Sequence, residues 1–378
     1  MFTLALIMLF LWVLVTCLTL LGTAVALTRL NSNPPYWEGA CHSPPVSILK
    51  PLKGVDRGIR KNIESFFNLQ HPQYELIFSA ANEDDPVCTT VQELMATHPN
   101  VSAQLIIGDT NAGPNPKINN LMKSYELAKH ELILISDSNV RVRPDYLDRQ
   151  LAHFDHQVGI VTAVVAGRNG KGLGGQLEAM QLNTFYTRWI HLLFLFKNPC
   201  VIGKSMLFSR KEAERFGGIK TLARYLAEDY MAGQAMRMLG LKIVLMSDPI
   251  EQHVGQKTFK DYWFRHVRWG RIRKAQAPLA FCFEPLVSPL LVGSCGAIAF
   301  LNFFAVPPIV FFASYFAVLL MSDTLLFRKL EPNVRMQTVL IWCLKELFCL
   351  PLWLHIAIGN SVVWRGKKYR VLPGGLLE

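Results

Sequence analysis

The sequence has few charged residues and no sign of paired cysteines. Only 18% of the 378 residues are charged, whereas 51% are hydrophobic. The eight cysteines include no Cys-x-x-Cys pair and no His/Cys spacing typical of a zinc site. These absences exclude a disulfide-rich secreted scaffold and a structural zinc module, and they favour a reducing compartment. The chain also lacks internal repeats, which excludes a solenoid.

Charge is absent altogether from the first apolar run, Phe2 to Leu27. A membrane span needs about 20 predominantly apolar residues. The alternative is a signal peptide, whose apolar region has only about 7–15 residues and follows a basic segment. Because no Lys or Arg precedes Arg29, a retained transmembrane anchor at residues 1–29 is favoured. The positive-inside rule then predicts an external N-terminus and a cytoplasmic location for the bulk of the chain.

The C-terminal third is apolar again. The runs Pro285–Val306 and Pro308–Phe327 predict two spans joined by a tight turn. A third run, Val339–Gly359, is interrupted by Lys345 and Glu346. Because a Lys-Glu pair in mid-membrane is costly, an interfacial or re-entrant segment is favoured there over a simple span.

Four regions follow from this pattern. The anchor is followed by a soluble-looking region at residues 44–276, by two to three membrane segments within residues 281–362, and by a basic tail at residues 363–378. In the soluble-looking region, short apolar runs alternate with segments of helical spacing. This alternation predicts an α/β fold. Its strands are expected to form a parallel sheet that helices cover on both faces.

The expected strands and helices are defined by their residue patterns. The strand candidates are VSILKP, YELIFSAAN, AQLIIG, ELILIS, IVTAVVAG and KIVLMS. The helix candidates are RGIRKNIESFFNL, VCTTVQELMATH, KINNLMKSYELAKH and AEDYMAGQAMRMLG. In such sheets ligands bind at the carboxyl ends of the strands. Polar residues that directly follow a strand are therefore candidates for a binding site.

Three acidic residues occupy such positions or open a helix. Asp137 directly follows the apolar run ending at Ser136, Asp85 follows an earlier strand, and Asp229 lies at the start of a helical pattern. A carboxylate at a strand end can hold a hard divalent cation beside a phosphate-bearing ligand. The alternative is local: Asp137 could serve only as a turn cap, and Asp229 as a helix cap.

Downstream, the stretch FKDYWFRHVRWGRIRK brings Arg265, Arg268 and Trp269 within about one helical turn of each other. Arginine forks bind phosphate oxygens in pairs, and an indole offers a flat apolar face. The same charges would also suit a basic amphipathic helix on an anionic membrane surface. Both interpretations can hold for one helix.

Taken together, these features resemble the D, D, D, (Q/R)xxRW signature of glycosyltransferase families 2 and 21. The signature reads here as Asp85, Asp137, Asp229 and Arg265-His266-Val267-Arg268-Trp269. The blocks VSILKPLKGVD, NPKINNLM, LISDSNVRV and YLAEDYMAGQA resemble, in order and spacing, those of the ceramide glucosyltransferases of family 21. Related bacterial hopanoid glycosyltransferases carry similar blocks.

This resemblance implies a GT-A, Rossmann-like fold and inverting transfer of a sugar from a UDP-sugar to a lipid hydroxyl. Asp229 matches the general base, Asp137 the metal and diphosphate site, and Asp85 the nucleotide site. The motif residues Arg265, Arg268 and Trp269 match the diphosphate and acceptor region. Lys117, Lys53 and Asp56 match donor-binding blocks, and Gly203–Arg210 resembles a block that lines the sugar pocket.

The metal motif departs from the Asp-x-Asp of many GT-A enzymes. The chain has Asp137-Ser138-Asn139 instead, so that Asp137 and Asn139 are the expected ligands of Mg²⁺ or Mn²⁺. An amide oxygen can bind the ion but carries no charge. The motif therefore favours neither Mg²⁺ nor Mn²⁺.

Donor and acceptor also have alternatives. UDP-glucose and ceramide are favoured, and a UDP-N-acetylglucosamine-dependent hopanoid glycosyltransferase is the main alternative. A processive polysaccharide synthase shares the signature but needs more membrane helices for a channel, and a non-catalytic scaffold is disfavoured because all signature carboxylates are present. The net charge of +11 suits an anionic membrane and an anionic donor; no nucleic-acid motif occurs. We therefore expect an integral protein of a bacterial inner membrane or a eukaryotic endomembrane.

Overall fold

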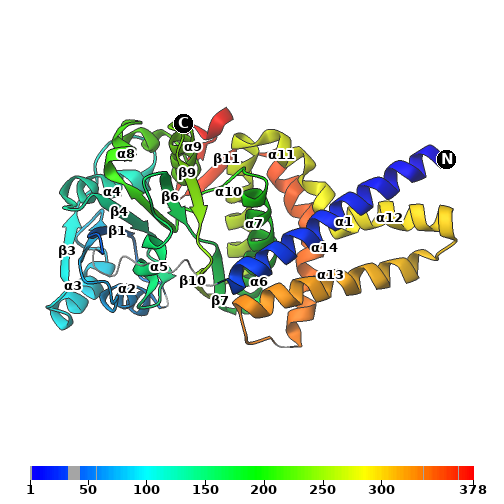
Figure 1. The fold of residues 1–378 in the computed structure, drawn as a ribbon, viewed down its shortest axis with the longest axis horizontal. Helices are drawn as coiled ribbons and strands as arrows, with labels where there is room; N and C mark the ends of the chain where they lie inside the picture. The colour runs from blue at the N-terminus through cyan, green and yellow to red at the C-terminus, as the bar shows by residue number, and fades with distance from the viewer. Residues whose placement is uncertain (1, 33–42, 57, 335, 365) are drawn as a thin grey trace. The chain divides into compact units, whose positions relative to one another are not determined.

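A computed structural model describes residues 2–32, 43–56, 58–334, 336–364 and 366–378 (Figure 1). The chain forms two compact units, each assembled from segments far apart in the sequence. The helical unit contains Met1–Leu30, Gly167–Leu195 and Gln256–Gly375. The sheet unit contains Asn31–Ala166, Phe196–Gly255 and Leu376–Glu378.

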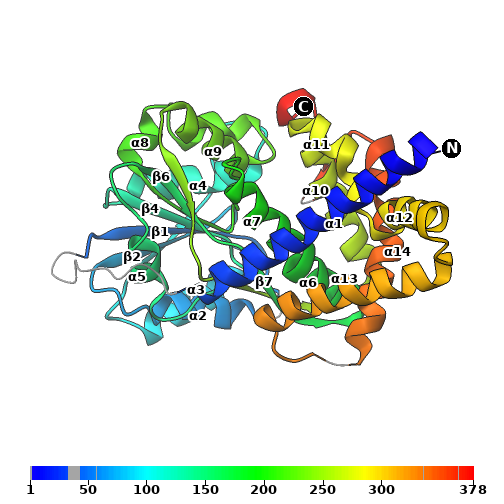
Figure 2. The same ribbon diagram turned by 45° about the vertical axis from the view of Figure 1, so that its right-hand side comes forward.

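The sheet unit is built on seven strands in the order β3-β2-β1-β4-β8-β6-β9. Their bounds are β1 Val46–Leu52, β2 Tyr74–Ala80, β3 Ser102–Ile107, β4 Leu132–Ser136, β6 Val158–Thr162, β8 Ser205–Ser209 and β9 Lys242–Leu245. The central strands β1 and β4 are buried along their whole length, because helices cover both faces of the sheet (Figures 1 and 2). The predicted α/β architecture is therefore confirmed.

One strand departs from the expected parallel arrangement. Strand β8 runs antiparallel to both neighbours, and Ser136 at the end of β4 pairs with Ser205 at the start of β8. The residues just before β8 consequently lie at the edge where β4 ends. The expected strand IVTAVVAG is also divided, into β6 and β7 (Val165–Lys171), and β7 leads into the helical unit.

Four helices of the sheet unit match the predicted periodic segments: α2 Ile59–Phe67, α3 Val87–Thr97, α4 Pro116–Leu127 and α9 Glu228–Met238. Three short ones were not predicted: α5 Tyr146–Leu151, α8 Arg210–Glu214 and the 3-10 helix η2 Ile219–Arg224. The side chain of Asn115 caps α4 by accepting hydrogen bonds from the amides of Lys117 and Ile118. This cap fixes the start of α4. Two short strands, β5 (Val140–Arg141) and β10 (Ile250–Gln256), pair antiparallel beside the main sheet.

The helical unit contains the apolar runs and the arginine-rich helix. Its elements are α1 Phe2–Asn31, α6 Gly172–Gln181, the π-helix η1 Leu182–Tyr186, α7 Thr187–Leu195, α10 Phe259–Gln276, α11 Pro278–Phe283, the 3-10 helix η3 Glu284–Val287, α12 Pro289–Phe304, α13 Pro308–Leu330, α14 Gln337–Ile358, and the hairpin β11 Ser361–Trp364 with β12 Lys367–Arg370. Aromatic side chains, including Trp12, Phe311 and Trp342, join α1, α13 and α14 in one core. A two-stranded antiparallel hairpin follows the last long helix.

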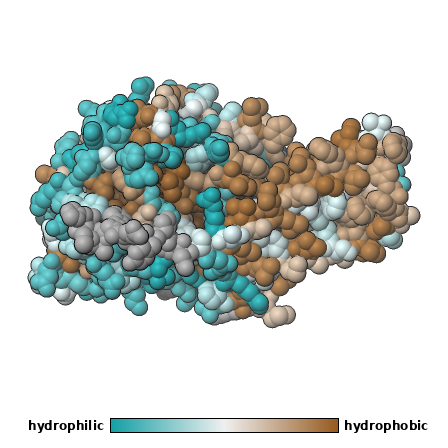
Figure 3. Space-filling view, viewed as in Figure 1, coloured by the Kyte–Doolittle hydropathy of each residue, from teal (hydrophilic) through white to brown (hydrophobic). Residues whose placement is uncertain are grey.

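Among the described residues, α1, α13 and α14 are long and apolar enough to cross a membrane. Helix α12 reaches that length only together with α11 and η3, from which it is bent by 58°. Large apolar side chains such as Phe10, Leu301 and Ile309 are exposed on these helices, and Figure 3 shows the hydrophobic surface. Such a surface is expected to face lipid rather than water. The chain is therefore that of a membrane protein.

The structure adds detail to the expected membrane segments. The run Val339–Gly359 lies almost entirely in the single long helix α14, whereas the run Pro285–Val306 falls in the bent pair Pro278–Val287 and Pro289–Phe304. The Lys345 ammonium contacts Glu346 at 2.7 Å and Asp323 of α13 at 3.0 Å. Because each charge has a partner, the cost that argued against a span is largely offset.

Candidate active site

The carboxylate of Asp137 lies among ammonium groups at the end of β4. Lys117 Nζ lies 2.9 Å from Asp137 Oδ1, and Lys204 Nζ lies 3.5 Å from Oδ2. Burial would raise the pKa of Asp137, but Lys117 and Lys204 together hold it well below its ordinary value. Asp137 is therefore ionised at neutral pH, and both of its oxygens face cations, which is more than a turn cap requires.

A third lysine, Lys50, approaches Asp137 from within the sheet. It lies in the middle of β1 with no exposed surface, and its Nζ donates to the Asp137 carbonyl at 3.0 Å and to Ser136 Oγ at 3.3 Å. The ammonium also lies 3.5 Å from the centre of the Phe66 ring. Burial lowers the pKa of Lys50 well below its ordinary value, against the opposing effect of Asp137. Lys50 thus holds the end of β4 in place from the buried interior of the sheet.

Lys117 also links Asp137 to the start of α9. Its Nζ lies 2.8 Å from Glu228 Oε1 and donates to the Gly203 carbonyl at 3.0 Å. Asn115 Nδ2 completes the arrangement by donating to Glu228 Oε2 at 3.2 Å. The predicted donor-binding residue Lys117 is therefore already held between two carboxylates.

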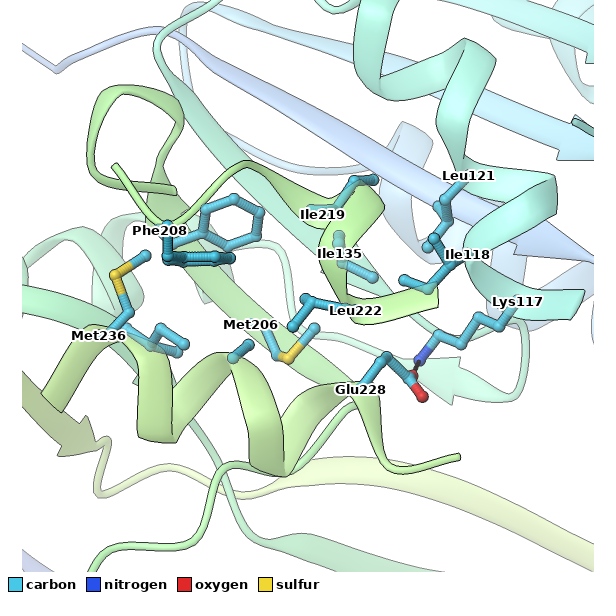
Figure 4. Close-up of a pocket in the computed structure, with 13 residues that line it drawn as sticks. Lys117, Ile118, Leu121, Ile135, Met206, Phe208, Ile219, Leu222, Glu228 and Met236 are labelled. Atoms are coloured by element: carbon cyan, nitrogen blue, oxygen red, sulfur yellow. Dashed lines mark ion pairs between the residues drawn. The ribbon is translucent and has the colours of Figure 1, made fainter. Parts of the chain in front are cut away.

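The Lys117–Glu228 pair closes one end of an apolar cavity in the sheet unit. Figure 4 shows the two side chains meeting beside Ile118, Leu222 and Met206. The cavity measures only about 10 Å³, which barely reaches the size of one water molecule. It is a packing defect of the core and not a substrate pocket.

Asp229 stands next to this cluster, in the first turn of α9. Its Oδ2 accepts a hydrogen bond from the Gly203 amide at 2.7 Å, and its Oδ1 accepts one from the Tyr230 amide at 2.8 Å. Burial and the neighbouring Glu228 raise the pKa of Asp229 to about 6, although Lys117 and the amides oppose the shift. A carboxylate with a pKa this close to neutrality is suited to accept a proton.

Asp85 joins two loops at the same edge of the sheet. Its carboxylate accepts hydrogen bonds from the Gly54 amide, at 2.9 and 3.0 Å to its two oxygens, and from the Val87 amide at 3.0 Å. The loop after β1 is thereby tied to the start of α3. Lys53 and Asp56 lie in this loop and are exposed, so their side chains are accessible to a ligand.

The two expected metal ligands, Asp137 and Asn139, both contact the ammonium group of Lys204. Lys204 Nζ lies 2.8 Å from Asn139 Oδ1 and 3.5 Å from Asp137 Oδ2. Within the described residues, no group of three or more His, Cys, Asp or Glu side chains is arranged to hold a metal ion. Two oxygen donors around one positive charge nevertheless fit a hard divalent ion that takes its remaining ligands from a diphosphate and water.

Arg265 and Trp269 of the motif lie together on α10 of the helical unit. Arg265 Nη1 lies 2.5 Å from Glu178 Oε1 of α6, and its guanidinium carbon lies 5.5 Å from the centre of the Trp269 ring. Lys257 Nζ contacts the other oxygen of Glu178 at 3.0 Å. Burial would raise the pKa of Glu178, but Arg265 and Lys257 lower it to about 2. This carboxylate therefore anchors the motif; Arg268 is on the same helix and half-buried.

The sequence model of "Glycosyl transferase family 21" matches residues 9–377. The chain belongs to glycosyltransferase family 21. Proteins similar to this chain include two Caenorhabditis elegans proteins, ceramide glucosyltransferase 1 and ceramide glucosyltransferase 3.

 Ceramide glucosyltransferase 1 is 28% identical over 89% of this chain and 73% of its own length, and ceramide glucosyltransferase 3 is 31% identical over 88% and 74%. A ceramide glucosyltransferase of Komagataella phaffii is 27% identical over 89% of this chain and 83% of its own length.

A solved structure shares the fold of this family 21 chain. It is a mannosyltransferase from Pyrobaculum calidifontis in complex with GDP-Man and Mn2+, with a TM-score of 0.54 and 16% identity over 94% of this chain and 98% of that chain. The likeness supports the GT-A fold that the sequence predicts. The family match and the similar ceramide glucosyltransferases identify the chain as a glycosyltransferase enzyme.

Sequence reasoning missed several polar residues of this family 21 protein. Lys50 and Lys204 both contact Asp137 or its neighbours, and Glu178 holds Arg265. A lysine within the otherwise apolar strand VSILKP was a usable signal, because an unpaired charge is rarely buried. Lys204 lies in the block Gly203–Arg210, but its contact with Asp137 could not be predicted, since it depends on the reversed direction of β8.

Proposed function

We propose that this protein transfers a sugar from a UDP-sugar to the hydroxyl group of a membrane lipid, with inversion at the anomeric carbon. UDP-glucose and ceramide are the favoured substrates, because the curated relatives named above are ceramide glucosyltransferases. The observation that carries the proposal is that two carboxylates at one edge of the sheet have pKa values shifted in opposite directions. The pKa of Asp137 is strongly lowered, whereas that of Asp229 is raised to about 6.

In this proposal Asp229 is the general base. Inversion needs one displacement at the anomeric carbon, during which a base accepts the proton of the attacking hydroxyl. Asp229 is half-buried, and the Gly203 and Tyr230 amides orient its carboxylate. No covalent sugar–enzyme intermediate is required.

The donor's diphosphate would bind beside Asp137. Lys117 and Lys204 provide positive charge there, and Asp137 and Asn139 would hold a divalent ion, Mg²⁺ or Mn²⁺. When bound, such an ion offsets the negative charge that develops on the leaving nucleoside diphosphate. The Mn2+ present in the mannosyltransferase complex supports this assignment. Asp85, Lys53 and Asp56 would contact the nucleotide.

The motif on α10 offers further side chains of the kinds that this reaction needs. Arg265 and Arg268 would bind diphosphate oxygens, and Trp269 would offer a flat face to the acceptor region. We further propose that residues 44–276 form the cytoplasmic catalytic part. The anchor at 1–29, the segments within 281–362 and the basic tail at 363–378 would then hold it at the membrane.

The decisive experiment offers a panel of substrates to the purified full-length protein in detergent. UDP-glucose, UDP-N-acetylglucosamine and UDP-glucuronate are each combined with ceramide, diacylglycerol and a hopanoid polyol, and lipid products are identified by mass spectrometry. A hexosyl-ceramide product is expected. An N-acetylhexosaminyl-hopanoid would keep the mechanism but replace both substrates, and no glycolipid from any pair would refute the proposed function.

A further inference from the structure

A cavity of about 60 Å³ lies inside the helical unit. Its apolar wall includes Leu319 of α13, Leu352 of α14 and Trp189 of α7. Its polar wall includes Tyr186 and His266. A cavity of this size has room for more than one water molecule, or for a small polar group that carries a hydrocarbon chain.

The charges around this cavity cancel. Three basic and three acidic side chains line it: Arg188, Arg273, Lys345, Glu284, Asp323 and Glu346. Each basic group already contacts a carboxylate: Arg188 pairs with Asp323, Lys345 with Asp323 and Glu346, and Arg273 with Glu284. A charged ligand would have to break one of these pairs or remain uncompensated in a buried place, and both are unfavourable.

One polar atom in the wall lacks a partner. His266 is 3% exposed, and its Nε2 has no hydrogen-bond partner among the described residues. Its other ring nitrogen, Nδ1, lies 3.5 Å from the Tyr186 hydroxyl. Burial lowers the pKa of His266 to about 3, against the opposing effect of Glu178, so the ring is neutral at physiological pH. A buried neutral nitrogen of this kind calls for a hydroxyl or amide group.

We propose that this cavity binds the uncharged polar head of the acceptor lipid, with the unpartnered nitrogen of His266 hydrogen-bonded to a hydroxyl or amide group of that head. The inference rests on the proposed function and adds to it a location and a chemical class. Lipids that carry hydroxyl or amide groups fit the balanced wall, whereas lipid phosphates do not. The hydrocarbon chain would lie along the apolar wall formed by α13 and α14.

The test measures lipid binding directly, without sugar transfer. Full-length protein in nanodiscs is titrated with radiolabelled ceramide, and unlabelled diacylglycerol and polyprenyl phosphate are used as competitors. Ceramide is expected to bind, and polyprenyl phosphate is expected to compete at least about tenfold less well, since it would leave a charge uncompensated. Equal or stronger competition by the lipid phosphate would overturn the proposal.

Two variants locate the binding. Leu319→Trp fills the cavity and is expected to weaken ceramide binding by about tenfold or more. Its matched control is Leu325→Trp on the same helix, where the native side chain is 51% exposed and the expected change is below about twofold. His266→Phe keeps a ring but removes the polar nitrogen, and an approximately tenfold loss is expected. UDP binding, measured by calorimetry, checks that each variant is folded.

The outcomes separate the two proposals. If Leu319→Trp and Leu325→Trp bind ceramide equally well, the cavity is not the lipid site, even if the wild-type protein transfers sugar to ceramide. If the wild-type protein transfers sugar to no lipid but Leu319→Trp selectively loses ceramide binding, the proposed function fails while the assigned lipid site stands.

Discussion

The charge cluster around Asp137, at the edge of the sheet, differs from the one around Asp323, among the long helices. In the sheet unit, Lys117 and Lys204 share the carboxylate of Asp137, whose side chain is 29% exposed. In the helical unit, Arg188 and Lys345 share Asp323, whose side chain is only 4% exposed. Both clusters place one carboxylate between two cations, but only the first is open to solvent.

The partners of the second cluster explain the difference. Asp323 also accepts a hydrogen bond from Trp342 Nε1 at 2.8 Å, Lys345 donates to Thr184 at 3.2 Å, and Arg188 donates to Thr23 at 2.9 Å. Every charged group in this cluster is thus held by several helices at once. We conclude that the helical cluster fixes how the helices pack, whereas the sheet cluster is able to exchange partners when a ligand arrives.

The largest expected effect comes from the base of the sheet cluster. Asp229→Asn removes the proton acceptor while keeping the size of the side chain and one acceptor oxygen for the two backbone amides. Sugar transfer should fall by about 10²–10⁴-fold. Product formation is measured by mass spectrometry, with UDP binding as the control. Unchanged turnover would remove Asp229 from the role of base.

The helical cluster should respond through stability instead. Asp323→Asn leaves Arg188 and Lys345 buried without a full counter-charge, so the free energy of unfolding should fall by about 3–5 kcal/mol. Thermal unfolding in detergent measures this loss. The matched variant Asp137→Asn, in the more exposed cluster, should lower stability less but weaken UDP-sugar binding more. If both variants lose mainly stability, the proposed difference between the two clusters is wrong.

The dependence of the transfer rate on pH tests the role of Asp229 as the general base. A general base must be deprotonated, and the pKa of Asp229 is raised to about 6 by burial and by Glu228. The rate should therefore be highest above pH 7 and should fall about tenfold per pH unit well below pH 6. The measurement is kcat/KM from pH 5 to pH 8. A flat profile across pH 6 would contradict the assignment.

The smallest effect is expected at Lys204, which contacts both proposed metal ligands. Lys204→Met removes a cation that competes for Asp137 and Asn139. Without nucleotide, Mn²⁺ should bind about tenfold more tightly to the variant, a change of about 1.4 kcal/mol. Electron paramagnetic resonance of free Mn²⁺ reports this affinity without turnover. Weaker Mn²⁺ binding in the variant would show that Lys204 does not compete with the metal.

Much of the sheet unit could be predicted from local patterns. Strands β1 to β4 and helices α2 to α4 follow apolar runs and helical spacing, which depend on near neighbours in the chain. Strand β8 was missed because its five residues, SMLFS, lie outside the regular strand-helix alternation. The reversed direction of a strand depends on its partners in the sheet, and a single sequence does not reveal those partners.

The same limit applies to the polar residues. Asp137 and Asp229 could be chosen because each stands at the end of a local pattern. Asp323 went unnoticed inside an apolar run, since its partner Arg188 is 135 positions away. The roles assigned to Asp85, Lys53, Asp56 and the α10 motif remain predictions, because they concern contacts with a ligand.

The reversed strand β8 has a consequence for how the site can vary. The Gly203 amide binds Asp229, the Gly203 carbonyl binds Lys117, and the next side chain, Lys204, reaches Asp137. A Cβ atom at Gly203 would lie 2.7 Å from Asp229 Oδ2 and 3.0 Å from its Cβ. Two adjacent residues therefore bind both the proposed base and the proposed diphosphate site. Over evolutionary time, a substitution at Gly203 or Lys204 would therefore change the surroundings of the proposed base and of the proposed diphosphate site together.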